Sequence, residues 1–290
     1  MESLIQLVVT GLATGAIYAL IALGMVLIFK STGVFNIAQG QLLLVGAFIC
    51  FTLSSRLGVP FWAAILLTLP CAFLLGLLIE RLCLRPMIGK PLLGVIIMTL
   101  GLASLLKGLT VTIWGPQTRS FPAYLPSEPL HIGKVYISYE YIFAFGIAMA
   151  LIIGFTLFFR TKLGLAMRVV SEDQEVAQAT GIRVGMIFGL AWAVSAMAAA
   201  LGGISLATIS ALDYNIGDVG LLAFPVIVLG GLESIPGAIV AGLAVGLLES
   251  FAARYIPLSA FQVVFPYVIL ILVLIVRPYG LFGQKRIERV

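Results

Sequence analysis

LIQLVVTGLATGAIYALIALGMVLIF, residues 4–29, is an apolar run without a single charged side chain. An α-helix needs roughly 20 mostly apolar residues to cross a hydrocarbon core about 30 Å thick, so this run is long enough to span a membrane. Glu2 stands where a secretory signal would carry basic residues, and the run is longer than the roughly 7 to 15 apolar residues of such a signal. We therefore expect residues 4–29 to remain as the first span.

Further apolar runs follow along the whole chain. Of its 290 residues, 61% are hydrophobic and 10% are charged, whereas soluble proteins carry about 25% charged residues. The sequence therefore predicts an all-α protein, a polytopic transmembrane helical bundle. The expected spans are 4–29, 36–54, 60–80, 92–112, 139–159, 184–209, 218–232, 235–253 and 258–276. The range 218–232 is short enough to be re-entrant, which would leave eight spans, and residues 1–290 are expected to form one transmembrane domain.

The basic residues predict the orientation of these spans. With the N-terminus outside the cytoplasm, most of the 17 Lys and Arg residues fall in cytoplasmic loops, as the positive-inside rule requires. Loop 160–183 and the C-terminus are then cytoplasmic, and loop 113–138 is periplasmic. The cytoplasmic set is Lys30, Arg81, Arg85, Lys90, Arg160, Lys162, Arg168, Arg183, Arg277, Lys285, Arg286 and Arg289, and the outer set is Arg56, Lys107, Arg119, Lys134 and Arg254. Because these residues are spread between the apolar runs and do not cluster on one soluble face, the net charge of +5 reports topology rather than binding to nucleic acid.

Small residues four positions apart predict where helices approach one another closely, because lipid supplies no hydrophobic drive between helices. Such stripes occur at Gly11 and Gly15, at Gly185 and Gly189, and at Ala238, Gly242 and Gly246.

Two polar segments with glycines interrupt the apolar pattern, at residues 33–41 (GVFNIAQGQ) and 213–220 (DYNIGDVG). Such backbone is tolerated at membrane depth where it is buried in protein or lines a water-filled cavity, and paired interruptions point to a transport site within an inverted repeat. The candidate residues of a substrate pathway are Asn36, Gln39, Gln41 and Asn215. The alternative is that both segments are ordinary polar turns.

Loop 160–183 contains a short helix, expected from Glu172 to Thr180. Ser171 is a suitable N-cap with Gln174 three residues later, and Gly181 suits the left-handed position that follows a helix. A helix this short cannot cross a membrane, and one apolar and one acidic side suit docking into a groove on a cytoplasmic partner. A helix at the lipid interface would instead favour basic and aromatic residues. The expected apolar side comprises Val169, Val170, Val176 and Ala177.

This loop resembles the coupling loop of ABC importer permeases for branched-chain amino acids, the LivH/LivM family. The residues that carry the likeness are Gly164, Ala166, Arg168, Asp173, Ala177, Gly181 and Ile182. Further likeness to the LivH branch is found in residues 15–20 (GAIYAL), 35–40 (FNIAQG), 228–231 (VLGG), 236–238 (PGA) and 277–283 (RPYGLFG). The sequence departs from the family at Val169, where Ala is common.

The resemblance implies a multi-pass protein of the bacterial inner membrane that works in a complex. Its partners would be a second, LivM-like permease subunit or a second copy, two cytoplasmic ATPase subunits and a periplasmic substrate-binding protein. The implied cargo is Leu, Ile or Val, although related permeases carry urea or short amides. The residues that the resemblance assigns to coupling with the ATPase are Gly164, Ala166, Arg168, Glu172, Asp173, Ala177 and Gly181.

The chain itself lacks the residues of an ATPase site. A P-loop ends in Gly-Lys-Ser/Thr, but Gly89-Lys90 is followed by Pro91 and Gly133-Lys134 by Val135. We therefore expect a transport subunit rather than an enzyme, without cofactor or metal, driven by a partner or by an ion gradient. An ion-coupled secondary transporter would need ionisable groups inside the membrane. The candidates Glu80, Lys107, Glu140, Glu233 and Glu249 lie near the expected span ends, and the three cysteines fit small apolar sites.

Overall fold

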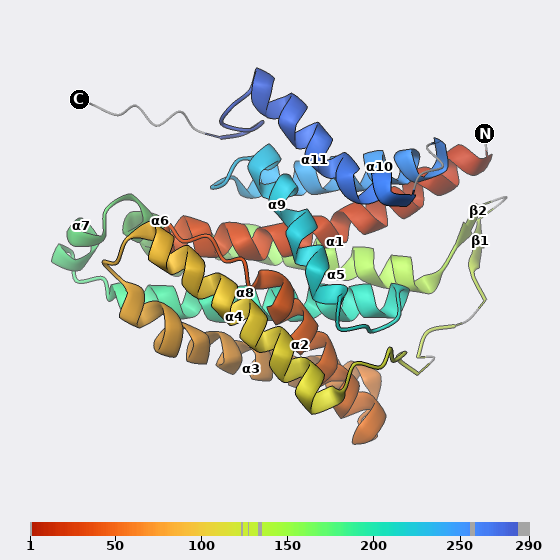
Figure 1. The fold of residues 1–290 in the computed structure, drawn as a ribbon, viewed down its shortest axis with the longest axis horizontal. Coiled ribbons are helices and arrows are strands. Elements are labelled where there is room, and N and C mark those ends of the chain that lie inside the picture. The colour runs from red at the N-terminus through yellow and green to blue at the C-terminus, as the bar shows by residue number, and fades with distance from the viewer. Residues whose placement is uncertain (1, 123, 127, 133–134, 256–258, 284–290) are drawn as a thin grey trace.

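The computed structural model describes residues 2–122, 124–126, 128–132, 135–255 and 259–283, and these are almost wholly helical (Figure 1). Each predicted span falls on one helix. These helices are α1 (Glu2–Thr32), α2 (Gln39–Phe51), α3 (Phe61–Ile79), α4 (Leu92–Trp114), α5 (Tyr139–Phe158), α8 (Val184–Ile209), α9 (Val219–Gly230), α10 (Ile235–Tyr255) and α11 (Ser259–Val276). The all-α polytopic bundle predicted from the sequence is thus confirmed.

Shorter elements join these helices. Two helices, α6 (Lys162–Glu172) and α7 (Gln174–Ala179), lie between α5 and α8, and an antiparallel hairpin of β1 (Leu130–Ile132) and β2 (Val135–Ile137) precedes α5. The π-helical turns η1 (Thr52–Arg56) and η2 (Glu80–Leu84) extend α2 and α3, while the 3-10 turns η3 (Arg85–Met87) and η4 (Ile216–Asp218) precede α4 and α9.

The helices differ in length. Among the described residues, six are long and apolar enough to cross a membrane: α1, α3 with its extension, α4, α5, α8 and α10. Helix α2 has 13 residues and α9 has 12. At 1.5 Å per residue these two are about 20 and 18 Å long, shorter than a core of about 30 Å, and η1 extends α2 by one further turn. The chain therefore crosses at 36–54 and at 218–232 with a half-length helix that is preceded by non-helical residues.

The two halves of the bundle repeat one arrangement. Helix α1 packs along α10 as α8 packs along α3, α2 lies on α8 as α9 lies on α1, and α2 meets α4 as α9 meets α11. Helix α1 runs towards the end of the bundle that carries α7, and α8 runs away from it (Figure 1). Helices α1–α4 and α8–α11 thus match as the inverted repeat predicted from the interrupted segments.

Glycines set the closest helix contacts. A Cβ on Gly15 would lie 2.8 Å from Leu243 Cα of α10, and one on Gly11 would lie 2.9 Å from Leu247 Cα. In the other half, a Cβ on Gly76 of α3 would lie 2.7 Å from Ala193 Cα of α8. The stripes on α1 and α10 are therefore packing faces, as predicted. The stripe at Gly185 and Gly189 instead meets the side chains of Arg85 and Leu77.

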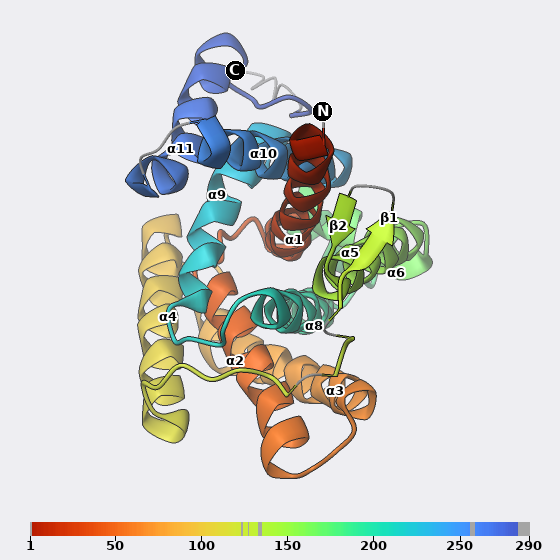
Figure 2. The same cartoon turned by 90° about the vertical axis from the view of Figure 1, so that its right-hand side faces the viewer.

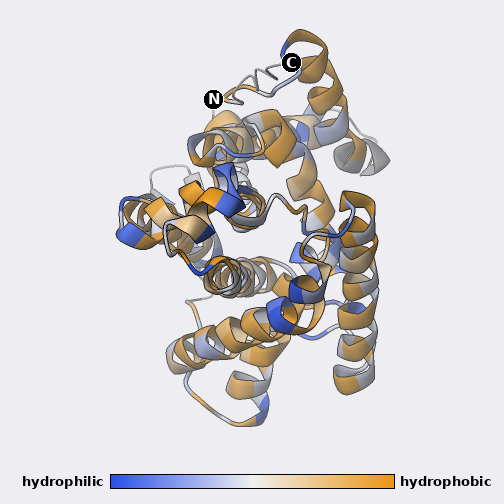
Figure 3. Cartoon of the chain, turned by 90° about the vertical axis from the view of Figure 1, so that its left-hand side faces the viewer, coloured by the Kyte–Doolittle hydropathy of each residue, from blue (hydrophilic) through white to orange (hydrophobic). Residues whose placement is uncertain are grey.

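Polar residues gather at the ends of the bundle. Large apolar side chains such as Leu93 and Ile275 are exposed on the outside, where lipid would cover them. Figure 3 looks onto the α7 end, where hydrophilic residues lie on the short helices and helix ends. Contacts such as Lys30 Nζ to Glu233 O, 3.2 Å, join helix ends there. Lys134, Lys285, Arg286 and Arg289 of the predicted orientation lie outside the described residues.

Candidate functional site

Helix α6 is held against the end of α5. Thr161 caps it by accepting a hydrogen bond from Gly164 N at 3.3 Å. A Cβ on Gly164 would lie 2.6 Å from Phe158 O, so the two helices meet backbone to backbone there. Arg168 Nη2 donates to Phe159 O. Gly164 and Arg168, both assigned to coupling by sequence, therefore position α6, while Ala166 is half-buried.

Helix α7 begins later than the sequence predicts. Ser171 belongs to α6, where its hydroxyl donates to Arg168 O at 2.7 Å. The N-cap is Asp173, whose carboxylate accepts from Glu175 N at 2.8 Å and from Val176 N at 3.0 Å. The predicted N-cap and the continuous helix from Glu172 to Thr180 are thus wrong. The extended backbone of Asp173 (φ −154°) separates two helices, because its carboxylate satisfies amides that would otherwise lack acceptors.

The other end of α7 closes as predicted. Gly181 has a φ of 85°. Its N–H donates to Gln178 O, and Ile182 N–H donates to Ala177 O, both at 3.0 Å. This pair of bonds is a Schellman motif, which requires the left-handed conformation that glycine adopts without strain.

The apolar and acidic residues around α7 do not lie on two separate sides, as the sequence predicted. Val170 and Ala177 are buried, but Val176 is 52% exposed. Because Asp173 breaks the helix, the predicted apolar residues no longer share one face. Glu172, Glu175 and Val176 all lie on the exposed side, which is therefore acidic with one apolar residue.

Arg85, which forms an ion pair with Glu80 in the turns after α3, also binds the start of α8, just beyond α7. Arg85 Nη2 lies 3.2 Å from Glu80 Oε2 and donates to Gly185 O at 3.3 Å. The Glu80 side chain is 2% exposed. The sequence placed Glu80 at an interface, whereas the structure shows it buried.

The two half-length helices meet at their N-terminal ends. A Cβ on Gly40 of α2 would lie 2.9 Å from Gly220 Cα of α9 and would collide with Gly217 O. Gln39 binds Ser195, which lies eleven residues into α8, or about 17 Å from the α7 end of that helix. The meeting point, hereafter the joint, is thus near mid-membrane.

The first polar segment is sealed within the bundle. Asn36 is 1% and Gln39 0% exposed. Asn36 Nδ2 donates to Gln39 Oε1 at 3.1 Å, and Gln39 Nε2 donates to Ser195 O at 3.3 Å. The Ser195 hydroxyl lies 3.0 Å from Gln39 Oε1 and 2.8 Å from Gly24 O. This network links α1, α2 and α8, and no sequence signal marked Ser195 as part of it.

The other two pathway candidates lie on the outer side of the joint. Gln41 is 7% exposed, and its Oε1 has no hydrogen-bond partner among the described residues. Asn215 is exposed, and its Oδ1 lies 3.3 Å from Lys107 Nζ of α4. Lys107 also pairs with Asp218 Oδ2 at 2.9 Å. The structure thus brings Asn36 and Gln39 together, sets Gln41 and Asn215 apart from them, and adds Lys107 and Asp218.

One known protein family matches this chain over almost its whole length. Residues 7–274 match the family described as the branched-chain amino acid transport system / permease component. The chain belongs to this family.

Related proteins align with almost the whole length of the permease. It is 33% identical to the high-affinity branched-chain amino acid transport system permease protein BraD of Pseudomonas aeruginosa, over 99% of the chain and 98% of BraD. It is 28% identical to LivH of Escherichia coli, over 99% and 97% of the two chains. Its identity to the probable LivH of Methanocaldococcus jannaschii is 30%, over 93% and 90%. The permease is accordingly a multi-pass protein of the bacterial inner membrane.

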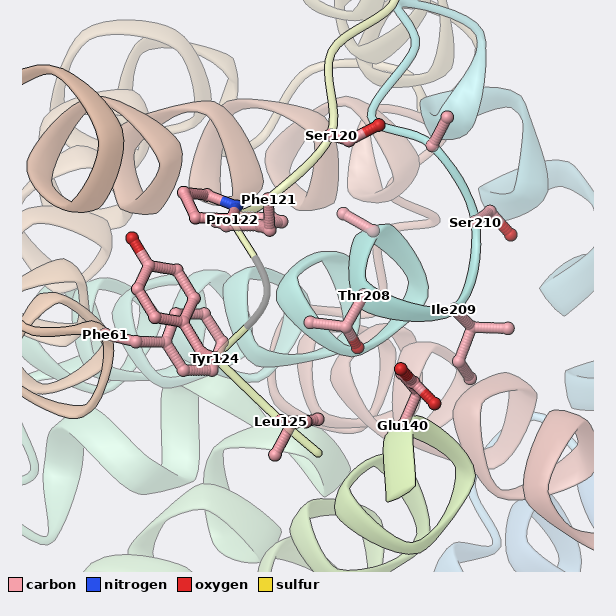
Figure 4. Close-up of a pocket in the computed structure, with 12 residues that line it drawn as sticks. Phe61, Ser120, Phe121, Pro122, Tyr124, Leu125, Glu140, Thr208, Ile209 and Ser210 are labelled. Carbon is pink, nitrogen blue, oxygen red and sulfur yellow. The ribbon is translucent and has the colours of Figure 1, made fainter. Parts of the chain in front are cut away.

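The permease also has a cavity of about 340 Å³ at the end opposite α7 (Figure 4). It lies where α3 and α5 begin and α8 ends. Phe61 and Tyr124 stack there with ring centroids 4.7 Å apart, and Glu140, Thr208 and Ser210 supply polar groups. None of the four pathway candidates lines this cavity. Within the described part of the chain, no three His, Cys, Asp or Glu side chains gather as a metal site would require.

Proposed function

We propose that this permease is the translocating subunit of a binding-protein-dependent ABC importer for leucine, isoleucine and valine. The observation that carries the proposal is the full-length match to the branched-chain amino acid permease family. The complex would contain a second, LivM-like permease subunit, two cytoplasmic ATPase subunits that hydrolyse ATP, and a periplasmic protein that delivers the substrate. The permease would have no enzymatic activity of its own.

In this proposal α7 is the contact with the ATPase. Asp173 caps one end and the Schellman motif at Gly181 closes the other, so the helix is a rigid unit despite its length. Val176 on its exposed side and Glu172 at the end of α6 would contact the partner, whereas Gly164, Arg168 and Ala177 would hold α6 and α7 in position. Movement of α7 would pass to α8 and, through Arg85 and Glu80, to α3.

The substrate would pass along the two interrupted segments, with Asn36, Gln39, Gln41 and Asn215 offering neutral hydrogen bonds. In the arrangement described here, Asn36 and Gln39 are sealed by their bonds to each other and to Ser195. Passage would therefore require the starts of α2 and α9 to separate. We assign the structure to a closed state of the pathway on this ground.

Uptake of radiolabelled amino acids tests the function. Cells that lack the permease should lose leucine, isoleucine and valine uptake, and the restored chain should recover it only with an intact partner ATPase. Unlabelled urea and short amides should not compete. Uptake that survives loss of the ATPase but stops when the ion gradient collapses would overturn the proposal in favour of a secondary transporter.

Substitution of Gly181 tests the coupling role. Gly181→Val forces a β-branched residue into a left-handed conformation, and should abolish uptake while the subunit still inserts. An added Cβ there meets no described atom within 4 Å, so strain rather than collision would cause the loss. The matched control is Gly154→Val on α5, where the space is also open but the helix is regular. Equal uptake by both variants would argue against this role of α7.

A further inference from the structure

A charged pair lies inside the membrane-spanning part of the permease, beside the start of α9. Lys107 lies seven residues before the end of α4 at Trp114, about 10 Å along the helix from that end. Its Nζ lies 2.9 Å from Asp218 Oδ2 and 3.0 Å from Oδ1. Lys107 therefore points sideways to α9 and does not extend along the helix to the membrane surface.

An amide, an aromatic ring and a second carboxylate lie around this pair. Asn215 Oδ1 lies 3.3 Å from Lys107 Nζ, and the ring of Tyr214 has its centroid 5.7 Å from the same nitrogen. Asp213 accepts from the Thr118 hydroxyl at 3.1 Å and from Asn215 N at 2.7 Å, which fixes the turn before α9. The group thus consists of Lys107, its partner Asp218, the amide of Asn215, and a second carboxylate, Asp213, that holds the turn behind the amide.

The pair is too exposed to face lipid. The Lys107 and Asp218 side chains are 32% and 47% exposed. Charged groups at this depth are costly against hydrocarbon and are found facing a bundle interior or a water-filled cavity. The exposed side of the pair therefore faces water or a protein neighbour, and the permease has a hydrophilic surface here between otherwise apolar helices.

This surface continues to the joint of α2 and α9. A Cβ on Gly217, one residue before Asp218, would lie 2.7 Å from Gln41 Oε1. That oxygen is buried and has no hydrogen-bond partner among the described residues. A buried acceptor without a donor is unfavourable unless something else supplies one. Polar groups therefore extend from the exposed pair to the level at which Asn36 and Gln39 are sealed.

We propose that Lys107 and Asp218, with Asn215, form an outer binding site for a zwitterionic substrate. The substrate carboxylate binds Lys107 and its ammonium group binds Asp218, while the ion pair between the two side chains opens. The exchange leaves the net charge of the site unchanged, and a half-exposed pair contributes little stability, so the substrate can replace it. The inference rests on the proposed function, because it names a site for the same substrate class.

Uptake by the assembled importer tests this site. Lys107→Met and Asp218→Asn should each lower the maximal rate of leucine uptake roughly tenfold, the loss of about one charge-assisted hydrogen bond. Assembly with the ATPase subunits should be unchanged. The control is Arg56→Met, which removes an exposed basic residue of the predicted outer set. Uptake by Lys107→Met equal to that of Arg56→Met would overturn the site, whereas failure of the unmodified importer to take up leucine would overturn the proposed function.

The double variant Lys107→Met with Asp218→Asn separates binding from structure. If the pair only supports the fold, removing both charges should restore the uptake that either single change loses. A binding site predicts that uptake stays low. Recovery to the unmodified rate would therefore overturn the proposal.

Thiol labelling tests whether the site faces water. In a chain with Cys50, Cys71 and Cys83 replaced by Ala, Asn215→Cys should react with a membrane-impermeant thiol reagent added from the periplasmic side. Ile97→Cys, an exposed apolar position on α4, should not react. Absence of reaction at position 215 in the assembled importer would overturn the inference.

Discussion

The starts of α2 and α9 occupy matching places in the two halves of the bundle, but their surroundings differ. Both follow a polar segment that contains Asn-Ile, and they touch through Gly40 and Gly220. At the start of α2, neutral amides are buried and bonded to each other and to Ser195. At the start of α9, Asp218 and Asn215 are exposed and meet Lys107.

This difference shows how one repeated backbone supports two kinds of surface. Figure 2 shows α1 and α8 passing through the middle of the molecule, with α2 and α9 beside them. Since α2 lies on α8, its polar residues find partners within the bundle, whereas the residues before α9 face α4 at the edge. We infer that the start of α2 closes the joint, and that the start of α9 remains accessible to water.

The largest effect is expected from adding one methyl group at the joint. Gly40→Ala places a Cβ against Gly217 O and 2.9 Å from Gly220 Cα, and backbone on both sides cannot yield without separating α2 from α9. The yield of folded, ATPase-bound permease should fall to near zero. Gly101→Ala on α4 is the control, because an added Cβ there meets no described atom within 4 Å. A normal yield of the Gly40 variant would mean that the two helix starts do not touch.

Loss of the buried Gln39 amide should have the second largest effect. Gln39→Leu leaves the buried Asn36 Nδ2 without its acceptor, at about 1–3 kcal/mol for an unsatisfied buried group. The variant complex should unfold at a clearly lower temperature in detergent. Asn215→Leu, at the exposed start, should leave the unfolding temperature nearly unchanged. Equal shifts for the two variants would remove the contrast between sealed and accessible starts.

Transport should respond to Asn36 without a change in apparent affinity. Asn36→Leu is expected to lower the maximal uptake rate several-fold, because the pathway loses a neutral hydrogen-bonding group next to Gln39. The half-saturating concentration should stay the same, since the binding protein determines it. Initial-rate measurements over a range of leucine concentrations check both values. A change in apparent affinity alone would show that residues 33–41 form only a structural turn.

The smallest effect is expected when the exposed pair is removed and the stability of the protein is measured. Because both side chains are partly exposed, Lys107→Met with Asp218→Asn should change the unfolding free energy by less than about 1 kcal/mol. Unfolding of the purified double variant by heat or detergent measures this. A loss as large as that of Gln39→Leu would mean that the pair supports the fold, and the two starts would then differ less than we infer.

Several local features could be predicted from residue types alone. The glycines of α1 and α10 were expected to be packing faces, and Gly181 was expected to end a short helix, because each depends on sequence spacing and backbone freedom. The N-cap was assigned to Ser171 because Gln174 follows it by three residues, the spacing of a capping box. The carboxylate of Asp173 accepts two amide hydrogen bonds, so Asp173 is the N-cap instead.

The sequence by itself determined that nine apolar segments form helices in a membrane, because in lipid each helix must satisfy its backbone hydrogen bonds within itself. The apolar character of a segment depends only on its own residues, so it can be read along the chain. Only the tertiary structure decided that Gln39 binds Ser195, 156 residues away, and that Lys107 pairs with Asp218, 111 residues away. These pairs depend on how the two halves face each other, and no local pattern reports that. The half-length of α2 and α9 has the same cause, since each starts where the other half of the bundle meets it.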